Sequence, residues 1–516
     1  MNLDYRNIGV LFSLNSLNVL LNIAYSTLTV YYFGTSPSVA AFFAATVLGT
    51  AVSRFVQTGQ LVEIVVPRYH KIKQEVGQQE AMSIIATLCN FMAGTALLLV
   101  IGFILAGNQV VELLVPGFES ITKLDVLQIF TITGFLMPIQ IATNLFQGML
   151  NAENIYGKVE LTNTISLLVT VLILLIWGND GNIMALVIGL VISVLAQFAT
   201  TVYYLRQVNY RHKFTLKNQY FPLRELFKAI SATSAYMVGV QVFTFAFNAA
   251  LSQMPGGTFV IYRYAEVIYG KTANIFMIPI STVFFNEINR LINQNNGNLV
   301  RDFVTKNLNL SYFVVFVALL PFAAGGQYFI WTLWGGLKFN AHDVHEVYLL
   351  LCVFFATMVF NGPYMIFRKL AVSVARPEIQ YYLWAVGHLI SGAMAYFLIH
   401  NFGFLGLLIQ TFAHTFLMML IPVFTVYWNK PDYLGLHSPV EIYKITISML
   451  IGSSAAWAAS TVLGNFFNYN KLDSLLVSAA LATIALSILI GSSLWLKVQE
   501  LGVIRLKIEQ LIRRRS

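Results

Sequence analysis

The sequence predicts an all-α polytopic membrane protein that crosses a bilayer fourteen times, with both ends of the chain in the cytoplasm. Three observations predict this class. Of the 516 residues, 57% are hydrophobic and 10% are charged, whereas soluble domains carry about 25% charged residues. The apolar residues form stretches long enough for a membrane helix, which takes about 20 residues. The basic residues fall mainly in alternate gaps between these stretches, which indicates positive loops on the cytoplasmic side.

Reading the chain for such stretches predicts fourteen spans. The first is too long for a signal peptide, and no small-residue cleavage site follows it, so we expect it to be retained. The predicted spans are 8–32, 39–66, 80–106, 125–150, 160–178, 183–205, 229–251, 258–286, 307–334, 346–367, 380–400, 404–428, 442–464 and 474–496.

The distribution of the 31 lysines and arginines predicts the orientation. Of these, 25 lie in gaps on the same side as the N-terminus, and only Lys123, Lys338 and Lys471 lie in the opposite gaps. Counting one span too many or too few would destroy this alternation, so the even number of spans is well supported. Because the N-terminal side carries the basic residues, both termini are predicted to be cytoplasmic. The remaining three cations, which lie inside predicted spans, are Arg54, Arg263 and Lys271.

Composition and cysteine usage exclude several other classes. The net charge of +9 does not indicate a nucleic-acid partner, because the basic residues sit in short loops beside apolar stretches instead of on one face. Cys89 and Cys352 both lie in apolar stretches, so no disulfide framework or cysteine metal site is expected. Gly270-Lys271-Thr272 resembles the end of a phosphate-binding loop, but Ala265 occupies the required first glycine. We therefore expect no cofactor, no metal and no enzyme activity.

A weak internal similarity divides the chain. Leu113–Phe118 follows span three much as Thr332–Leu337 follows span nine, at an offset of about 219 residues. Six spans per half is an even number, so we expect parallel repeats about an axis along the membrane normal, chance similarity of apolar helices being the alternative. The predicted domains are 1–222 (spans one to six), 223–440 (spans seven to twelve), 441–497 (spans thirteen and fourteen) and a basic cytoplasmic tail, 498–516, expected to lie on anionic lipid or to dock a partner.

Polar stripes mark four of the predicted spans, namely one, two, seven and eight. Neutral side chains in such stripes either join helices or line a wet passage. Charged side chains cost about 2.5–3.5 kcal/mol each at a helix centre, so they indicate function more strongly. Arg263 and Glu266 stand one turn apart and could simply neutralise each other, whereas Arg54 has no carboxylate on its own face. The candidate substrate-binding residues, in a hydrated cleft expected between the two lobes, are Arg54, Arg263, Lys271, Glu266, Asn22, Ser26, Gln57, Gln241 and Asn274.

Histidines suggest two further sites, which we interpret conservatively. His342 and His345 fall in an outer gap, and we expect a solvated loop there, with a metal site as the alternative. His388 and His414 fall in spans eleven and twelve. Packed, hydrogen-bonded histidines are the simpler interpretation, and a proton relay is the alternative.

Several short motifs lie in the first loop and span two, in the turn after span three, at the exit of span four and in span eight. They are Phe33-Gly34-Thr35-Ser36, Ala41-Phe42-Phe43, Arg54, Gly59, Val66-Pro67, Pro116-Gly117-Phe118, Gly148-Met149-Leu150-Asn151 and Tyr264-Ala265-Glu266. These motifs resemble those of the MurJ/MviN family, in an arrangement that covers roughly residues 1–440.

The resemblance implies a flippase of the superfamily that includes polysaccharide exporters and multidrug extruders. Its substrate would be an undecaprenyl-pyrophosphate-linked sugar, typically the peptidoglycan precursor lipid II, in the bacterial inner membrane. The family's charged positions, thought to hold the pyrophosphate, are largely replaced here: Tyr25-Ser26, Ser53, Thr58 and Val267 stand where the family has charged residues. Arg54 is retained, and Arg263 and Lys271 would replace the missing positive charges from nearby positions.

We therefore expect alternating access that carries a lipid-linked anionic saccharide, with membrane lipids and a coupling ion as the other partners. A cation-coupled multidrug or small-solute antiporter is one alternative, with Glu266 or Glu63 as the cation site. A non-transporting scaffold for envelope assembly is another. Substitution of the three embedded cations distinguishes these hypotheses, because only a transporter would lose activity while still folding.

Overall fold

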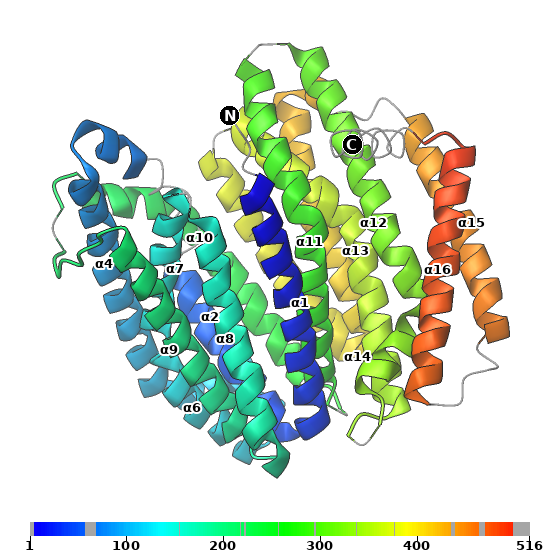
Figure 1. Ribbon diagram of the computed structural model, residues 1–516, viewed down its shortest axis with the longest axis horizontal. Helices are drawn as coiled ribbons and strands as arrows, with labels where there is room; N and C mark the ends of the chain where they lie inside the picture. Colours follow the sequence, from blue (N-terminus) through cyan, green and yellow to red (C-terminus); the bar gives the residue numbers. More distant parts are fainter. Residues whose placement is uncertain are drawn as a thin grey trace. The chain divides into compact units, whose positions relative to one another are not determined.

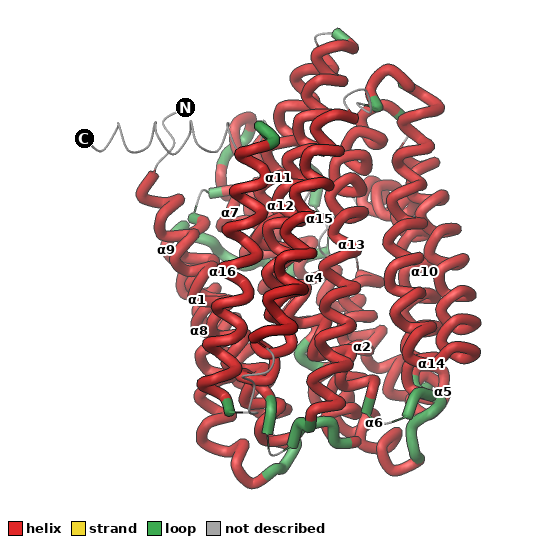
Figure 2. The backbone as a smooth tube through the Cα atoms, turned by 90° about the vertical axis from the view of Figure 1, so that its right-hand side faces the viewer, coloured by secondary structure: helices red, strands yellow, loops and turns green. Residues whose placement is uncertain are grey.

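The structure is a computed structural model, and it confirms the all-α class. Within the described ranges the chain forms helices joined by short connections, and no strand occurs (Figure 2). The described residues are 5–56, 69–153, 155–216, 218–220, 223–255, 257–293, 296–336, 338–375, 377–434, 439–463 and 470–498.

Contacts between residues group the chain into two compact units. Unit 1 comprises Met1–Val260 with Ala395–His400, and unit 2 comprises Ile261–Met394 with Asn401–Ser516. The lobe boundaries drawn from the sequence at residues 222 and 440 stay a prediction.

Unit 1 contains nine α-helices and a short 3₁₀ helix in its described part. Helix α1 packs along α8, which packs along α9, while α2 lies against α6 and α4 lies against α7 (Figure 1). Small residues on α2, such as Ala44 and Gly49, let its backbone approach its neighbours closely, and most of this helix is buried. The elements are α1 (Tyr5–Phe33), α2 (Pro37–Val56), α4 (Gln78–Leu105), α5 (Gly107–Leu114), α6 (Ser120–Gly134), α7 (Met137–Ala152), α8 (Tyr156–Trp177), η1 (Gly178–Asp180), α9 (Met184–Gln207) and α10 (Leu223–Ser252).

Unit 2 consists of longer helices. Helix α12 packs against both α13 and α16, and α15 packs against α16. The start of α13 is a capping box in which the Asn340 side chain and Asp343 satisfy each other's backbone N–H groups. The elements are α11 (Thr258–Asn293), α12 (Gly297–Trp334), α13 (Ala341–Val374), α14 (Pro377–Asn429), η2 (Pro431–Tyr433), α15 (Pro439–Leu463) and α16 (Lys471–Trp495).

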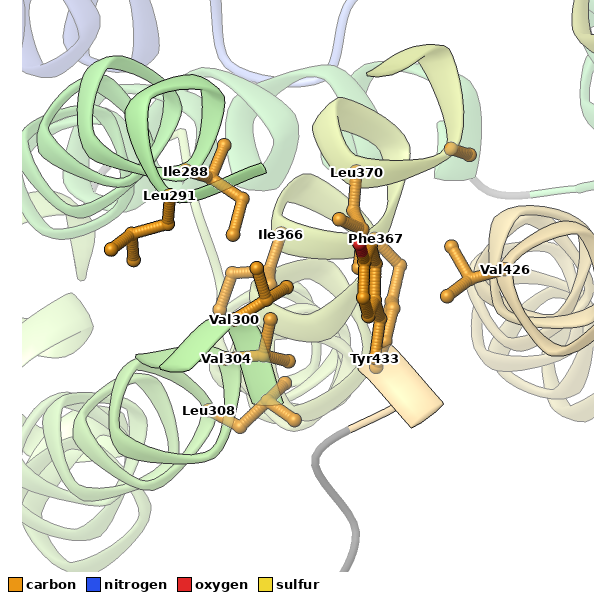
Figure 3. Packing of buried hydrophobic residues seen from close by; sticks show 11 residues of the cluster. Ile288, Leu291, Val300, Val304, Leu308, Ile366, Phe367, Leu370, Val426 and Tyr433 are labelled. Atoms are coloured by element: carbon orange, nitrogen blue, oxygen red, sulfur yellow. The ribbon is translucent and has the colours of Figure 1, made fainter. Parts of the chain in front are cut away.

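One end of unit 2 is closed by an apolar cluster that joins four helices and η2 (Figure 3). Residues from the end of α11 and the start of α12 meet residues from the end of α13, with Val426 and Tyr433 completing the cluster. These side chains come from helix ends that the sequence places far apart. Their burial therefore fixes how the long helices of this unit converge.

Helix α14 is interrupted inside its length. Its 53 residues would extend about 80 Å at 1.5 Å per residue, far more than one bilayer crossing needs. Gly403 breaks the helical geometry with φ 54° and ψ −130°, a backbone conformation that only glycine adopts readily. The break falls between the predicted spans 380–400 and 404–428.

Ten helices in the described part are long and apolar enough to cross a membrane, or eleven if α6 and α7, bent by 45° at their junction, form one span. Pro138 is the second residue of α7, just after that bend, where a proline without an N–H group fits the first helical turn. The described residues of the predicted spans are almost entirely helical, except that span 125–150 is broken at residues 135–136 between α6 and α7. The count of fourteen crossings and the orientation stay predictions. Residues 499–516 of the basic tail lie outside the described residues.

Candidate functional site

Arg54 stands in the last described turn of α2 and has an exposed side chain. Its Nη1 donates a hydrogen bond of 3.0 Å to the hydroxyl of Thr244 on α10. Sequence reasoning left water, a neighbouring helix or an anionic ligand to satisfy this charge, and the structure provides a hydroxyl from a neighbouring helix. The Arg54 guanidinium thus joins α2 to α10 and lies on an exposed surface of unit 1.

Gln241 joins the same two helices from a buried position. Its Nε2 donates to the backbone carbonyl of Ala51, one turn before Arg54, at 2.9 Å. Its Oε1 accepts no hydrogen bond from the residues that the structure describes. The predicted polar stripe of span seven thus faces α2, which places Gln241 and Thr244 together with Arg54 as one polar patch.

Asn22 and Ser26 are both buried on α1. The amide of Asn22 donates to the carbonyl of Asn18 at 2.6 Å, and the hydroxyl of Ser26 donates to the carbonyl of Asn22 at 2.6 Å. Both side chains therefore satisfy themselves within their own helix. These hydrogen bonds run along α1 and do not join either residue to Arg54.

The α1 stripe instead meets α8 through Asn18. The Asn18 amide donates to the Glu160 carboxylate at 3.3 Å, and the Asn18 Oδ1 accepts from the Thr164 hydroxyl at 2.7 Å. Sequence reasoning missed Glu160, which is the first residue of predicted span five. The signal was present, because Glu160, Asn163 and Thr164 share helical spacing.

In unit 2, Arg263 and Glu266 form an ion pair on α11 between Nη1 and Oε2. The guanidinium of Arg263 is largely buried and lies 5.5 Å from the centre of the Tyr262 ring, whereas the Glu266 carboxylate is about half exposed. The pairing expected from their spacing is therefore present. Arg263 can reach an anionic ligand only in competition with Glu266.

The family-like motif in α11 also has a packing role. Tyr264, which precedes Ala265 and Glu266, is fully buried. Its ring lies 5.5 Å from that of Trp334 and 6.1 Å from that of Phe339. Tyr264 thus packs the start of α11 against Trp334 and Phe339. The Arg263–Glu266 pair lies beside it on the same helix.

Three predicted site residues stay untested by geometry. Helix α11 runs through Lys271 and Asn274, whose side chains lie outside what the structure describes, and Gln57 lies outside the described residues altogether. Two residues before Lys271, the Tyr269 hydroxyl accepts a hydrogen bond of 2.6 Å from the Asn361 amide on α13. Sequence reasoning missed this contact, because it depends on how α11 and α13 pack.

Another family-like motif, Pro116-Gly117-Phe118, docks on the far end of α10. The Gly117 N–H donates to the Ser252 hydroxyl at 3.1 Å, and the Phe118 ring lies 5.1 Å from that of Phe259. A Cβ at position 117 would approach the Ser252 carbonyl oxygen to 2.4 Å. Glycine is therefore required by close approach, and this turn fixes the end of the helix that carries Thr244.

Comparisons with known proteins agree with these motifs. The profile of the family described as lipid II flippase MurJ matches residues 29–478. No curated protein matches the chain. Among solved structures, a lipid II flippase MurJ in an inward closed conformation is similar with a TM-score of 0.71 and 18% identity, covering 93% of this chain and 98% of that one.

Two further solved structures share the fold at lower similarity. An inward-facing multidrug resistance MATE family transporter of the MOP superfamily has a TM-score of 0.60 and 13% identity, covering 82% of this chain and 97% of that one. A MOP superfamily transporter from Pyrococcus furiosus has a TM-score of 0.57 and 13% identity, covering 83% of this chain and 94% of that one. Because the family profile spans most of the sequence, the chain belongs to the lipid II flippase MurJ family, a family of membrane transporters and not of enzymes.

Proposed function

We propose that this protein flips a lipid-linked anionic saccharide precursor, lipid II or a polysaccharide repeat unit, across the bacterial cytoplasmic membrane by alternating access. Fourteen spans and cytoplasmic termini are part of this proposal. The observation that carries it is Arg54, an exposed cation on an apolar helix of a MurJ-family chain.

The argument from Arg54 is energetic. A charged side chain at the centre of a membrane helix costs about 2.5–3.5 kcal/mol even on the lenient insertion scale. The Arg54 side chain is exposed, so an anionic group of the substrate can reach its guanidinium and contribute to offsetting this cost. A pyrophosphate offers the strongest match, since guanidinium groups bind phosphate oxygens by charge-assisted hydrogen bonds.

The other polar candidates take secondary roles. Lys271 would add a second positive charge, and Arg263 would join only after exchanging Glu266 for the substrate. Gln241, whose buried Oε1 accepts no hydrogen bond from described residues, would accept from a sugar or lipid hydroxyl. Asn22, Ser26, Gln57 and Asn274 would line the polar path.

The membrane potential can drive such transport without ATP. Moving two negative charges outward across about 100 mV, negative inside, gains roughly 4.6 kcal/mol. A cation-coupled antiporter remains a second candidate, because Glu266 on α11 is half exposed and can bind a cation if Arg263 releases it. That release would break the ion pair of a largely buried guanidinium, so the flippase is the better supported function.

The test is flipping of a fluorescent undecaprenyl-pyrophosphate-linked sugar by the purified protein in liposomes. Arg54→Ala should slow flipping about tenfold or more, the effect of losing a hydrogen bond to a charged group, and Arg54→Lys should retain part of the rate. Arg301→Ala is the matched control, because Arg301 lies beside Asp302, 3.8 Å away, in a gap between predicted spans.

Each outcome decides between the hypotheses. If the wild-type protein moves no lipid-linked precursor, the flippase proposal is wrong and the scaffold or antiporter hypothesis takes its place. If Arg54→Ala flips as fast as wild type, substrate recognition does not depend on this cation.

A further inference from the structure

The segment that joins α9 to α10 is docked along α4. This segment, residues 208–220, follows the end of α9 at Gln207 and precedes the start of α10 at Leu223, and most of its described part has no regular secondary structure. The side chains of Gln78 and Gln79, at the start of α4, donate to its first two backbone carbonyls at 3.4 Å each. We call residues 208–220 the strap.

Asn90, about three turns further along α4, is the centre of the docking. Its amide nitrogen donates to the carbonyls of Lys213 at 2.8 Å and Thr215 at 3.1 Å, and its Oδ1 lies 2.8 Å from Nε2 of His212. The Tyr210 hydroxyl lies 2.9 Å from the other ring nitrogen. Because both amide hydrogens are used, the Asn90 oxygen accepts from Nε2–H of the imidazole, and Tyr210 donates to Nδ1. One side chain of α4 thus holds three residues of the strap.

The far end of the strap is held as well. The Asn218 amide donates to the Ser83 hydroxyl on α4 at 2.9 Å, and the Asn218 Oδ1 accepts from the Tyr220 N–H at 2.9 Å. This contact lies only five residues before Leu223, where α10 begins. The docked strap therefore ties the start of α10 to α4.

Polar contacts hold the strap, and burial contributes little. None of its described residues is buried, and the Phe214 side chain is 92% exposed. The rings of Tyr210 and His212 lie 5.4 Å and 6.1 Å from the Phe146 ring on α7. Segments with few buried apolar contacts open locally at a low cost in free energy. Since α4 is itself buried from Ala81 to Cys89, the strap can leave without unfolding this helix.

Docking shortens the connection to α10. The five residues from Asn218 to Leu223 extend about 18 Å at most, whereas the sixteen residues from Gln207 to Leu223 extend about 55 Å. Helix α10 belongs to unit 1 by its contacts, and the chain passes into unit 2 at Ile261 in the next helix. The sequence predicts α10 as the first span of the second lobe. Rocking of that lobe would therefore pull on the strap.

We propose that the strap is a releasable tether that sets how far the start of α10 can move from α4. Alternating access moves this helix end away from α4 in one of its two states. The strap leaves α4 in that state and docks on Asn90 and Ser83 again in the other. The need for release during transport rests on the proposed function, whereas the docking and the release do not.

Trypsin cleavage after Lys213 in the purified full-length protein measures release, because cleavage tracks the population of the open segment. Asn90→Ala removes the hydrogen bonds to three strap residues and should raise the cleavage rate at least about tenfold. Thr95→Ala is the matched control, because the Thr95 hydroxyl donates within α4, to the Phe91 carbonyl at 2.9 Å. Equal cleavage rates in these two variants would overturn the proposal.

A reversible cross-link tests whether transport needs the release. Ser83→Cys with Asn218→Cys places two thiols where the side chains now form a hydrogen bond, in a background that carries Cys89→Ala and Cys352→Ala. If this disulfide does not form, Asn90→Cys with His212→Cys takes its place. We expect the oxidised protein to resist cleavage after Lys213 and to lose most of its flipping in liposomes. A reducing agent should restore both, and the single-cysteine variants should not respond to oxidation.

The outcomes separate the tether from the proposed function. The tether is overturned if oxidised and reduced protein are cleaved after Lys213 at the same rate, and its role in transport is overturned if both flip the lipid-linked sugar at the same rate. If cleavage responds as expected but neither form moves the sugar, the proposed function alone is contradicted.

Discussion

A buried carboxylate outside the predicted spans offers the sharpest test of the fold. Glu153 follows α7 directly, and its Oε1 accepts from the hydroxyl of Tyr69 at 2.5 Å and from Lys73 Nζ at 2.6 Å, with Oε2 also 2.6 Å from that nitrogen. Tyr69 is fully buried, and the side chains of Glu153 and Lys73 are 13% and 34% exposed. The cluster joins residues 69–75, which are helical, to the end of α7.

The substitution is Glu153→Gln, which removes the charge but keeps an oxygen for Tyr69. Hydrogen bonds to charged groups contribute about 1.5–3 kcal/mol, and Lys73 recovers some hydration because it is a third exposed. We therefore expect a loss of about 2 kcal/mol in the free energy of unfolding. Glu75→Gln is the matched control, since its partner Lys71 is 3.9 Å away and both are more than half exposed; an exposed pair contributes about 0–1 kcal/mol.

The pH dependence has a definite sign. Burial raises the pKa of Glu153, but the hydrogen bonds from Lys73 and Tyr69 and the charge of Lys73 outweigh this and lower the pKa below its usual 4.5. The carboxylate therefore stabilises the fold fully above pH 4.5, and this contribution is lost as pH falls through the lower folded value. Denaturant unfolding of wild type and both variants in detergent measures it. Equal losses for Glu153→Gln and Glu75→Gln at pH 7 would refute the reasoning.

Two other predictions concern unit 1. Gly117→Ala should lower the free energy of unfolding by about 1–3 kcal/mol, the usual effect of overpacking. The reason is that the new methyl group would approach the Ser252 carbonyl oxygen to 2.4 Å. The melting temperature of the variant measures this loss. Burial lowers the pKa of His212 below 6.5, and its ring contacts Asn90 on α4 and Tyr210. Stability from neutral His212 is therefore present above pH 6.5 and lost as pH falls below it, so the protection of amides around Asn90 against hydrogen exchange, relative to their intrinsic rates, should fall at pH 5.5.

Controls for these two predictions are available in the same unit. Gly94→Ala on α4 meets no atom within 4 Å and should leave the melting temperature unchanged or raise it, because alanine favours helix over glycine. If Gly117→Ala has the same melting temperature as Gly94→Ala, the turn around Gly117 does not pack against α10 as described. His212→Phe should remove the pH response of exchange near Asn90, and an unchanged response would assign it to another group.

Much of the architecture follows from local sequence alone. Hydrophobic length predicts where helices run, and helix occupies nearly all described residues of the predicted spans, the break between α6 and α7 inside span 125–150 being the exception. The same reasoning singles out Arg54, because a charge in an apolar stretch is visible without knowing its neighbours. It also pairs Arg263 with Glu266, since residues one turn apart on a helix share a face.

Contacts between helices were decided only by the tertiary structure. Arg54 meets Thr244 across 190 residues of sequence, and Asn18 meets Glu160 across 142. The physical reason is that helical periodicity specifies which residues share a face but not which faces meet. In a membrane, hydrophobicity does not select helix partners, so small residues and hydrogen bonds decide the packing. The sequence by itself thus determined the class, the helices and the cation inside span two, and packing decided that Arg54 meets Thr244 and that Glu160 accepts from Asn18.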